Sequence, residues 1–527
     1  MDTKALRQKV LDLAIRGKLV PQDPNDEPAS VLLERIRQQK KQMVRDGKLK
    51  PKDIKNDTII FVGEDNLHYE KFADGSVKCI EDEIPFDLPE GWEWERLSNL
   101  AYFSGGKTPS TSHGEYWDGD TLWVTSKDMK SKYITSSQLR LSSLGAEQMQ
   151  MYPPNTLLLV TRSGILRHTL PVAILKECAT INQDLKAIVL YMPQLVEYIY
   201  MCLKGMETQL LLKYTKSGTT VENVNFDEFQ KVLLPIPPVE QINKIVSSTG
   251  RAECVVTTIE DNKTALADYV VKAKSKILDF AIRGQLVPQD PNDEPASVLL
   301  ERIRTEKEKL IRQGRIKRDK KESVIFRGED NSYYEKIGTE VRCIDNELPF
   351  DLPASWTFAR LKHIGEIVGG GTPKTNIAEY WDGNIPWLTP ADFSGYEKMH
   401  ISAGARKITE LGLKSSSAQM LPKNSILYSS RAPIGYIAIA ANPVSTNQGF
   451  KSVVPYDSAM SLYLFYCLKA RTDDIVQRAT GTTFKEISGS EMAETIIPLP
   501  PSNEQQRIFN KVTQLFEAIT AIEKSLN

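Results

Sequence analysis

Apolar residues recur at alternating steps of three and four along the middle of the chain, from Glu240 to Ala281. This spacing places them on one stripe of a helix and is typical of a coiled coil. Twelve residues occupy the stripe, and all but Thr249 and Lys263 are apolar: Ile242, Ile245, Thr249, Ala252, Val256, Ile259, Lys263, Leu266, Val270, Ala273, Ile277 and Phe280. Such a stripe cannot stay in water, so the pattern predicts one long helix packed against a partner.

The two ends of the chain carry the same pattern in pieces. Residues 11–17 (LDLAIRG) match residues 278–284 (LDFAIRG), and residues 508–526 repeat the stripe of the first half of the long helix. We therefore predict that the C-terminal and N-terminal helices together replace a second long helix. It packs antiparallel on the middle helix under a pseudo-twofold axis, in a circular arrangement. Unrelated surface helices are the alternative, but they would not explain the matching break point.

The sequence also contains the same unit twice. Residues 19–37 and 286–304 both read LVPQDPNDEPASVLLERIR, and weaker echoes follow at an offset of about 265 residues. The echoes are FDLP (86–89 and 350–353), EYWDG (115–119 and 379–383), GTT (218–220 and 481–483) and P-x-PP (235–238 and 498–501). The chain is therefore two tandem copies of one unit. Identical segments beside divergent ones suggest one partner bound twice and another bound in two different ways.

Short apolar runs alternate with turns between the helical parts. LWVT (122–125), TLLLVT (156–161) and KAIVL (186–190) have the length and composition of strands, as do their counterparts in the second copy. We predict one independent α+β domain in residues 85–238 and another in residues 349–501. The Lys- and Asp-rich residues 48–83 and 315–347 are expected to be partly ordered connections or small additions.

Composition is that of an ordinary globular protein, with 41% hydrophobic and 26% charged residues. No apolar run approaches the roughly 20 residues of a membrane span, and the amphipathic, charged N-terminus does not have the pattern of a signal peptide. The six cysteines form no C-x-x-C pair, so we expect thiols in a reducing cytoplasm rather than a zinc site or a disulfide framework. The net charge of −1 disfavours wrapping of nucleic acid by charge alone but leaves local basic surfaces open.

No motif of a self-contained enzyme stands out. Residues 101–108 (AYFSGGKT) fit a loose phosphate-binding loop, but Pro109 follows at once and disfavours the helix that such a loop needs. The equivalent loop at residues 369–373 (GGGTP) has no lysine. The five histidines share no spacing that supports a hydrolytic triad. A catalytic site built from distant residues stays open, although a duplicated enzyme would usually echo its catalytic residues.

Polar residues with small or fork-shaped side chains do echo in the two domains. Arg, Asn, Gln, Ser and Thr are the side chains that read base edges and hold phosphates. The candidate DNA-binding residues of the first domain are Lys107, Thr108, Ser126, Lys127, Arg162, Ser163, Arg167, Asn182, Gln183, Thr219 and Thr220. Those of the second domain are Thr372, Lys374, Thr389, Arg431, Asn447, Gln448, Thr482 and Thr483. The alternative is that these residues are caps and turn formers, and it is strongest for the Gly-Thr-Thr segments and for Asp128 and Asp392, which could tie loops together.

Together the motifs resemble the specificity subunits of type I restriction–modification enzymes. The FDLP…W start, the GG-x-TP…YW-x-G…W centre and the P-x-PP…EQ end of each domain are similar to that family's target recognition domains. The AIRG-x-LV…EPASVLLERI segments resemble its conserved regions, and the resemblance covers nearly the whole chain. One departure is LRH at residues 166–168, where the second domain has PIG at 433–435, so the loop after Arg162 is expected to differ in shape.

The resemblance implies an α+β fold, with two α/β target recognition domains joined by a long antiparallel coiled coil in a circular pseudo-twofold arrangement. It divides the chain into an N-terminal conserved helical region (1–50), a connecting segment (51–84), target recognition domain 1 (85–238), a central conserved long helix with the repeat (239–314), a second connecting segment (315–348), target recognition domain 2 (349–501) and a C-terminal coiled-coil helix (502–527).

The resemblance also implies a non-catalytic, cytoplasmic subunit that binds double-stranded DNA. Each target recognition domain reads one half of an asymmetric bipartite site, and the coiled coil sets the spacer. Two methyltransferase (modification) subunits use S-adenosylmethionine to methylate adenine, and two restriction subunits driven by ATP with Mg²⁺ join them. None of these cofactors belongs to this chain.

The methyltransferase subunits are expected on the repeated segments. The candidate partner-binding residues are Leu32, Leu33, Glu34, Arg37, Leu299, Leu300, Glu301 and Arg304. The leucines could instead pack on the chain's own long helices. A different class of function is a two-domain scaffold for protein partners, which would keep the repeats but would not need two divergent polar faces.

Overall fold

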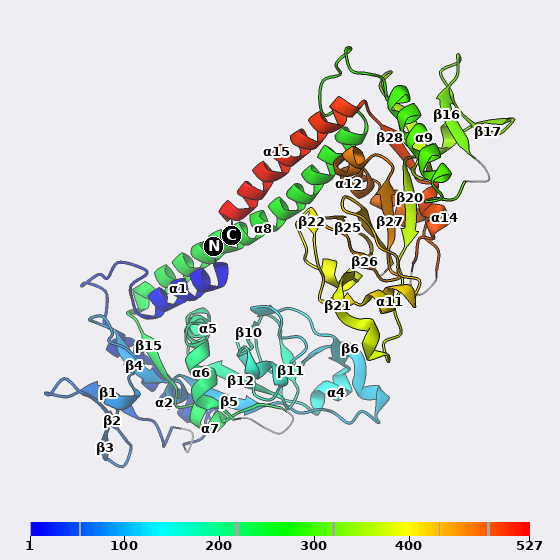
Figure 1. Cartoon of the computed structure of the whole chain (residues 1–527). Coiled ribbons are helices and arrows are strands. Elements are labelled where there is room, and N and C mark those ends of the chain that lie inside the picture. The colour runs from blue at the N-terminus through cyan, green and yellow to red at the C-terminus, as the bar shows by residue number, and fades with distance from the viewer. Residues whose placement is uncertain are drawn as a thin grey trace. The chain divides into compact units, whose positions relative to one another are not determined.

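The computed structural model describes residues 2–51, 54–216, 221–318, 322–431, 433–481 and 485–526. The chain divides into two compact units, Met1–Asn262 (unit 1) and Lys263–Asn527 (unit 2) (Figure 1). Each unit holds one copy of the repeat and mixes helices with sheets, which confirms the predicted fold class. Within the described ranges, none of the helices combines the length and the apolar character that a membrane crossing requires.

The predicted long helix is α8 (Val239–Ile282), which has 44 residues. In unit 1 its first part runs antiparallel to α1 (Thr3–Ile15), because Arg7 of α1 lies 3.2 Å from Glu260 while Asp26, beyond α1, accepts a hydrogen bond from Gln241. In unit 2 its second part pairs with α15 (Ser502–Leu526), where Lys274 lies 2.9 Å from Glu523. A terminal helix thus supplies each part of α8 with a partner.

Helices α1 and α8 end on the same glycine motif. Gly17 and Gly284 have φ angles of 66° and 69°, a conformation that costs other residues energy. The N–H of the next residue reaches back to the carbonyl of Leu13 or Phe280, the closure of a Schellman motif. A Cβ on Gly17 would lie 2.5 Å from Pro89. The glycine therefore ends the helix and lets the FDLP segment pack closely against it.

The two units contain matching sheets. Five-stranded sheets have the orders β5-β12-β9-β10-β7 and β20-β27-β24-β25-β22, and three-stranded sheets have the orders β11-β6-β8 and β23-β21-β26. The unit 1 strands are β4 (Glu93–Arg96), β5 (Ala101–Gly105), β6 (Trp117–Val124), β7 (Tyr133–Ile134), β8 (Leu139–Leu141), β9 (Leu157–Val160), β10 (Val172–Leu175), β11 (Ala179–Ile181), β12 (Leu185–Leu190), β13 (Thr215–Lys216), β14 (Asn223–Val224) and β15 (Leu233–Ile236). The unit 2 strands are β19 (Thr357–Arg360), β20 (Gly365–Gly369), β21 (Trp381–Leu388), β22 (His400–Ile401), β23 (Arg406–Ile408), β24 (Ile426–Ser430), β25 (Ile434–Ala440), β26 (Ser445–Thr446), β27 (Lys451–Pro455) and β28 (Ile496–Leu499).

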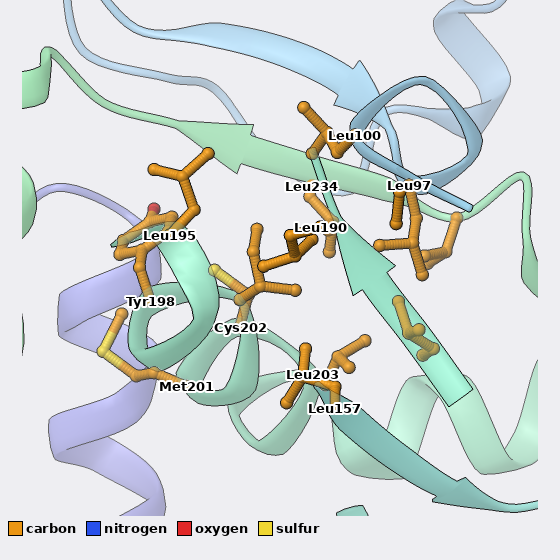
Figure 2. Close-up of a cluster of buried hydrophobic side chains, with 14 of the residues drawn as sticks. Leu97, Leu100, Leu157, Leu190, Leu195, Tyr198, Met201, Cys202, Leu203 and Leu234 are labelled. Atoms are coloured by element: carbon orange, nitrogen blue, oxygen red, sulfur yellow. The ribbon is translucent and has the colours of Figure 1, made fainter. Parts of the chain in front are cut away.

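Strand β9 is buried on both faces, which explains its continuous apolar run. Leu157 and Leu159 belong to the core that α5 (Val196–Gly205) covers, and Leu158 and Val160 belong to a second core beside the three-stranded sheet. Figure 2 shows Leu157 meeting side chains of α5 in the first core. The longer remaining helices are α6 (Glu207–Tyr214), α12 (Ser461–Ala470) and α13 (Thr472–Arg478), and the short ones are α3 (Leu97–Leu100), α4 (Ser143–Glu147), α7 (Phe226–Phe229), α10 (Leu361–Ile364), α11 (Glu410–Lys414) and α14 (Gly489–Ala493).

The Lys- and Asp-rich connections carry small antiparallel sheets. These are β1 (Ile59–Val62), β2 (His68–Lys71) and β3 (Val77–Cys79) in unit 1, and β16 (Ser323–Arg327), β17 (Tyr333–Ile337) and β18 (Glu340–Cys343) in unit 2. A buried arginine joins each sheet to its domain. Arg96 donates to Glu70 at 2.7 Å, and Arg360 donates to Glu335 at 2.8 Å. We call these contacts the arginine clamps.

Helices α2 (Ala29–Arg45) and α9 (Ala296–Arg312) contain the second half of the identical segments. Leu32 and Leu33 are 2% and 5% exposed within the core of unit 1, and Leu299 and Leu300 are 1% and 6% exposed in unit 2. The expectation that these leucines face a partner is therefore wrong, because each unit buries the apolar stripe of its own helix. Glu34 and Glu301 are exposed, and Arg37 and Arg304 are half-buried.

Leu32→Ala should lower the free energy of unfolding by about 2–5 kcal/mol, because it opens a cavity in a packed core. Val31→Ala, its exposed neighbour on α2 (36% exposed), should change that energy by less than about 0.5 kcal/mol. Chemical denaturation followed by circular dichroism measures both variants. Equal effects would mean that the leucine is not packed as described.

Candidate nucleic-acid interface

The polar candidates of unit 1 follow strands whose ends meet at one edge. Strand β12 starts beside the end of β5, because Lys186 pairs with Gly105, and beside the end of β9, because Leu185 pairs with Val160. Strands β11 and β6 run parallel, so the loops after Ile181 and after Val124 leave on the same side. We call this side the strand-end edge of unit 1.

Backbone hydrogen bonds tie the loops of this edge together. The N–H of Lys107 donates to Ile181 at 3.0 Å, that of Asn182 to Val124 at 3.0 Å, and that of Thr161 to Asp184 at 2.8 Å. The edge thereby collects seven of the sequence-predicted residues: Lys107, Thr108, Ser126, Lys127, Arg162, Asn182 and Gln183. These residues come from four loops that lie far apart in the sequence.

Several side chains at the edge form hydrogen bonds with the loops of the edge itself. Thr108 donates to the side-chain oxygen of Gln183, which links two of the loops. Asn182 is buried and donates to Asp184 at 3.1 Å. Asp128 accepts from the backbone and hydroxyl of Thr125 and from the backbone of Gln138. The view of Asp128 as a residue that ties loops is therefore correct.

The two arginines of the loop after β9 have different surroundings. Arg162 is exposed, and its side chain has no hydrogen-bond or ion-pair partner among the residues that the structure describes. Arg167 donates to the buried carboxylate of Glu222 at 2.6 Å, and Ser163 caps the short helix that carries Arg167. Arg162 is therefore free to bind a ligand, while Arg167 and Ser163 hold the loop.

Unit 2 builds the same edge. Lys451 pairs with Gly369, the N–H of Ser430 donates to Gly449 at 2.7 Å, and that of Asn447 donates to Leu388 at 2.9 Å. The edge collects Thr372, Thr389, Arg431, Asn447 and Gln448, with Lys374 exposed in the loop after Thr372. As in unit 1, the threonine hydroxyl donates to the glutamine of the neighbouring loop, here Gln448.

Two of these residues have structural partners. Thr389 donates through its backbone and hydroxyl to Asp392 in a capping box, and the Asn447 side chain accepts from the backbone of Gly449 at 2.9 Å. They shape the loops, as the cap and turn alternative proposed. Thr219, Thr220, Thr482 and Thr483 lie outside the described residues.

The charges at the two edges differ. Arg431 lies 3.9 Å from Glu486, and Lys451 lies 3.4 Å from the same carboxylate. In unit 1 the position of Glu486 is taken by Asn223, whose backbone bridges to Arg162. Sequence reasoning missed Lys186, Lys451 and Glu486. The two lysines occupy the first position of matching apolar runs, residues 186–190 and 451–454. This correspondence between the two copies could have identified them.

Comparison with known proteins places the chain in a family. The family model described as "Type I restriction modification DNA specificity domain" matches residues 89–253 and 353–527. The MjaIX type I restriction enzyme specificity subunit of Methanocaldococcus jannaschii is 45% identical over 33% of this chain and 41% of that protein. The EcoAI specificity subunit of Escherichia coli is 24% identical over 99% of this chain and 90% of that protein.

A solved structure supports the fold. A chain from a study titled "Structural basis underlying complex assembly and conformational transition of the type I R-M system" has a TM-score of 0.52 at 17% identity. The match covers 84% of this chain and 94% of the solved chain. At this identity the likeness shows the fold alone.

Close backbone contact at the edge should make one glycine essential and its neighbour replaceable. A Cβ on Gly370 would lie 1.9 Å from the carbonyl oxygen of Asn447, whereas one on Gly369 meets nothing within 4 Å. Gly370→Ala should lower the free energy of unfolding by about 1–3 kcal/mol, and Gly369→Ala should change it by less than about 0.5 kcal/mol. Urea denaturation tests the pair, and an undisturbed Gly370→Ala variant would contradict the described packing of the edge.

Proposed function

The chain belongs to the type I restriction–modification DNA specificity family, and we propose that it is the sequence-recognition subunit of such a complex. Each target recognition domain reads one half of a bipartite, asymmetric DNA site with the loops of its strand-end edge. The observation that carries this proposal is that one scaffold presents two different sets of exposed groups.

The difference between the two edges is one of charge. In unit 1 the edge carries the exposed cations Lys107, Lys127 and Arg162. In unit 2 the places of the two lysines are taken by Gly371 and Ala391, and Arg431 stands near Glu486. Base edges differ in their donors and acceptors, so two edges with such different groups are suited to different half-sites.

The proposal assigns the chemistry to other subunits. Two modification subunits that bind S-adenosylmethionine and two restriction subunits that use ATP and Mg²⁺ associate with this non-catalytic chain. The exposed Glu34 and Glu301, at matching places in the identical segments, are suited to contact the same partner twice.

We expect Arg162→Ala to relax base preference in one half-site only and Arg431→Ala to do so in the other. A bidentate contact between arginine and guanine contributes about 1–3 kcal/mol of discrimination. Selection of methylated sites from random DNA by the reconstituted complex measures the preference of each half-site separately.

Two control variants show whether the effect of Arg162→Ala is specific to this residue and whether the contact is to a base or to a phosphate. Arg162→Lys keeps the charge but loses the planar fork, so recovery of normal selectivity by lysine would indicate a phosphate contact instead of a base contact. Arg140→Ala removes another exposed arginine of unit 1 and should leave both half-sites unchanged. Unchanged selectivity in Arg162→Ala would contradict its role in reading.

We propose further that α8 sets the number of unread base pairs between the half-sites. Its 44 residues correspond to about 66 Å at a rise of about 1.5 Å per residue. The helix supplies side chains to the cores of both units, so its length is fixed in the fold.

Insertion of seven residues after Lys263 should lengthen the selected spacer. Seven residues keep the apolar stripe in register and add about 10 Å, which is close to three base pairs. Three base pairs also rotate one half-site around the duplex, so affinity is expected to drop. Site selection should return the same half-sites with a longer spacer, and an unchanged spacer at normal activity would leave α8 as a scaffold only.

A further inference from the structure

The small sheets β1–β3 and β16–β18 each bury one face and expose the other. In unit 1 the inner face supplies Ile60 to a cluster with Ile80, Trp94 and Leu233. The same face supplies Glu70 to the arginine clamp. The outer face has no such cover, and Figure 1 shows both sheets extending away from the rest of their own units.

The outer faces carry the same side chains in the same register. In unit 1 strand pairing forms the rows Ile59–Lys71–Val77 and Phe61–Tyr69–Cys79. In unit 2 it forms the rows Val324–Lys336–Val341 and Phe326–Tyr334–Cys343. We call each set of six the outer face of its sheet. Only the first position differs, and it holds a β-branched aliphatic residue in both copies.

Exposure of these side chains also matches. Phe61 and Phe326 are 39% and 40% exposed, and Val77 and Val341 are 52% and 53% exposed. Phe61 stacks on Tyr69 with the ring centroids 5.9 Å apart, as Phe326 does on Tyr334. Apolar side chains at this exposure in two places are a candidate contact surface for another molecule.

Three positions beside the outer face have changed, while five of its six positions have not. Val62 is replaced by Arg327, Leu67 by Ser332, and Ser76 by Glu340 at matching positions. The substitutions introduce charge or remove apolar surface beside the face. A surface that binds the same molecule twice is expected to keep its side chains in this way while neighbouring positions change.

The surrounding charge disfavours DNA as that molecule. Residues 57–84 contain eight acidic and two basic residues, and residues 322–348 contain seven acidic and three basic ones. One acidic residue in each segment, Glu70 or Glu335, is buried in the arginine clamp, and the others add to the negative charge around the sheet. An acidic rim repels phosphates, whereas an apolar centre with a charged rim is the usual composition of a protein–protein interface. The occupant is therefore a protein with basic residues around an apolar patch.

Each small sheet is also joined to the helix of the identical segments. Lys40 of α2 lies 2.6 Å from Asp57, and Lys307 of α9 lies 3.6 Å from Glu322, so each helix is fastened to the start of its sheet. A stable interface needs about 800 Å² on each partner, more than six side chains supply. A surface of that size would have to include the exposed side of the adjoining helix as well as the sheet.

We propose that each outer face, together with the adjoining helix, docks one modification subunit. The inference rests on the proposed function, because it assumes that this chain recruits two such subunits. It adds the surface that holds them, which lies in the segments that the sequence predicted to be partly ordered connections or small additions.

Charge on one outer face should release one modification subunit. Phe61→Glu places a carboxylate on the outer face of unit 1, and Phe326→Glu does the same in unit 2. Native mass spectrometry of the full chain with the purified modification subunit should count one bound copy for each single variant and none for the double variant. Val62→Arg is the matched control, because arginine already occupies that position in unit 2 as Arg327, and it should keep two copies.

Two outcomes separate this inference from the proposed function. An unsubstituted chain that binds no modification subunit would overturn both. Two bound copies in Phe61→Glu and Phe326→Glu, at an unchanged melting temperature, would overturn the docking inference alone, as would loss of the restriction subunit only.

The exposed cysteines provide a test that does not depend on folding of a variant. Cys79 and Cys343 lie on the outer faces, and Cys178 is exposed elsewhere in unit 1. Excess modification subunit should slow maleimide labelling of Cys79 and Cys343 at least tenfold and leave that of Cys178 unchanged. Equal labelling of all three cysteines in the bound complex would contradict the proposal.

Discussion

The apolar stripe of α8 is the constraint on which both units depend. Ile242 and Ile245 belong to the core of unit 1, and Leu278 and Ile282 belong to the core of unit 2. The helix is therefore not a linker attached to finished domains, because neither core is complete without its side chains. Within each unit, packing fixes the end of α8 against the domain that carries the strand-end edge.

The arginine clamps hold the small sheets against the domains. Burial of each guanidinium costs desolvation energy, which its ion pairs with the carboxylates offset. A buried guanidinium is tolerated only where carboxylates compensate it, and Arg360 reaches both Glu335 and Glu347. Burial alone would raise the pKa of Glu335, but hydrogen bonds from Arg360, Ser323 and Arg342 outweigh it and lower that pKa to about 2. Because this pKa lies below the ordinary value of 4.5, the stabilisation is present above about pH 4.5 and is lost as the pH falls toward 2.

The carboxyl next to the clamp of unit 1 behaves in the opposite way. Burial raises the pKa of Glu95 to about 7, in spite of hydrogen bonds from Asn99 and the backbone of Arg96. Its protonated form is favoured in the fold, so its contribution is present below about pH 4.5 and is lost as the pH rises through 7. Unit 2 has Ala359 at this position. The two copies thus share the clamp but differ in their response to pH.

Local sequence patterns predicted the helices and strands. Long-range contacts determined which faces are buried and whether the connecting segments fold. The stripe from Glu240 to Ala281 gave the bounds of α8 to within one residue, because periodicity is a local property. The same rule marked Leu32 and Leu299 as one face of a helix but could not say that each unit would bury that face itself. Nor could composition show that the acidic connections fold into sheets, since their order depends on Arg96 and Arg360, far along the chain.

The strand-end edges show why a duplicated chain can diverge in function while keeping its fold. The backbone contacts that assemble an edge, such as the approach of Gly106 to Asn182 or of Gly370 to Asn447, do not depend on the exposed side chains. Lys107 can therefore become Gly371, and Asn223 can become Glu486, without loss of the loops that present them. The outer faces of the small sheets show the reverse pattern, because five of their six side chains stay the same while Val62, Leu67 and Ser76 beside them are replaced by Arg327, Ser332 and Glu340. These two opposite patterns within a single chain are what we expect if the edges read different half-sites, as proposed, and the outer faces bind one partner twice.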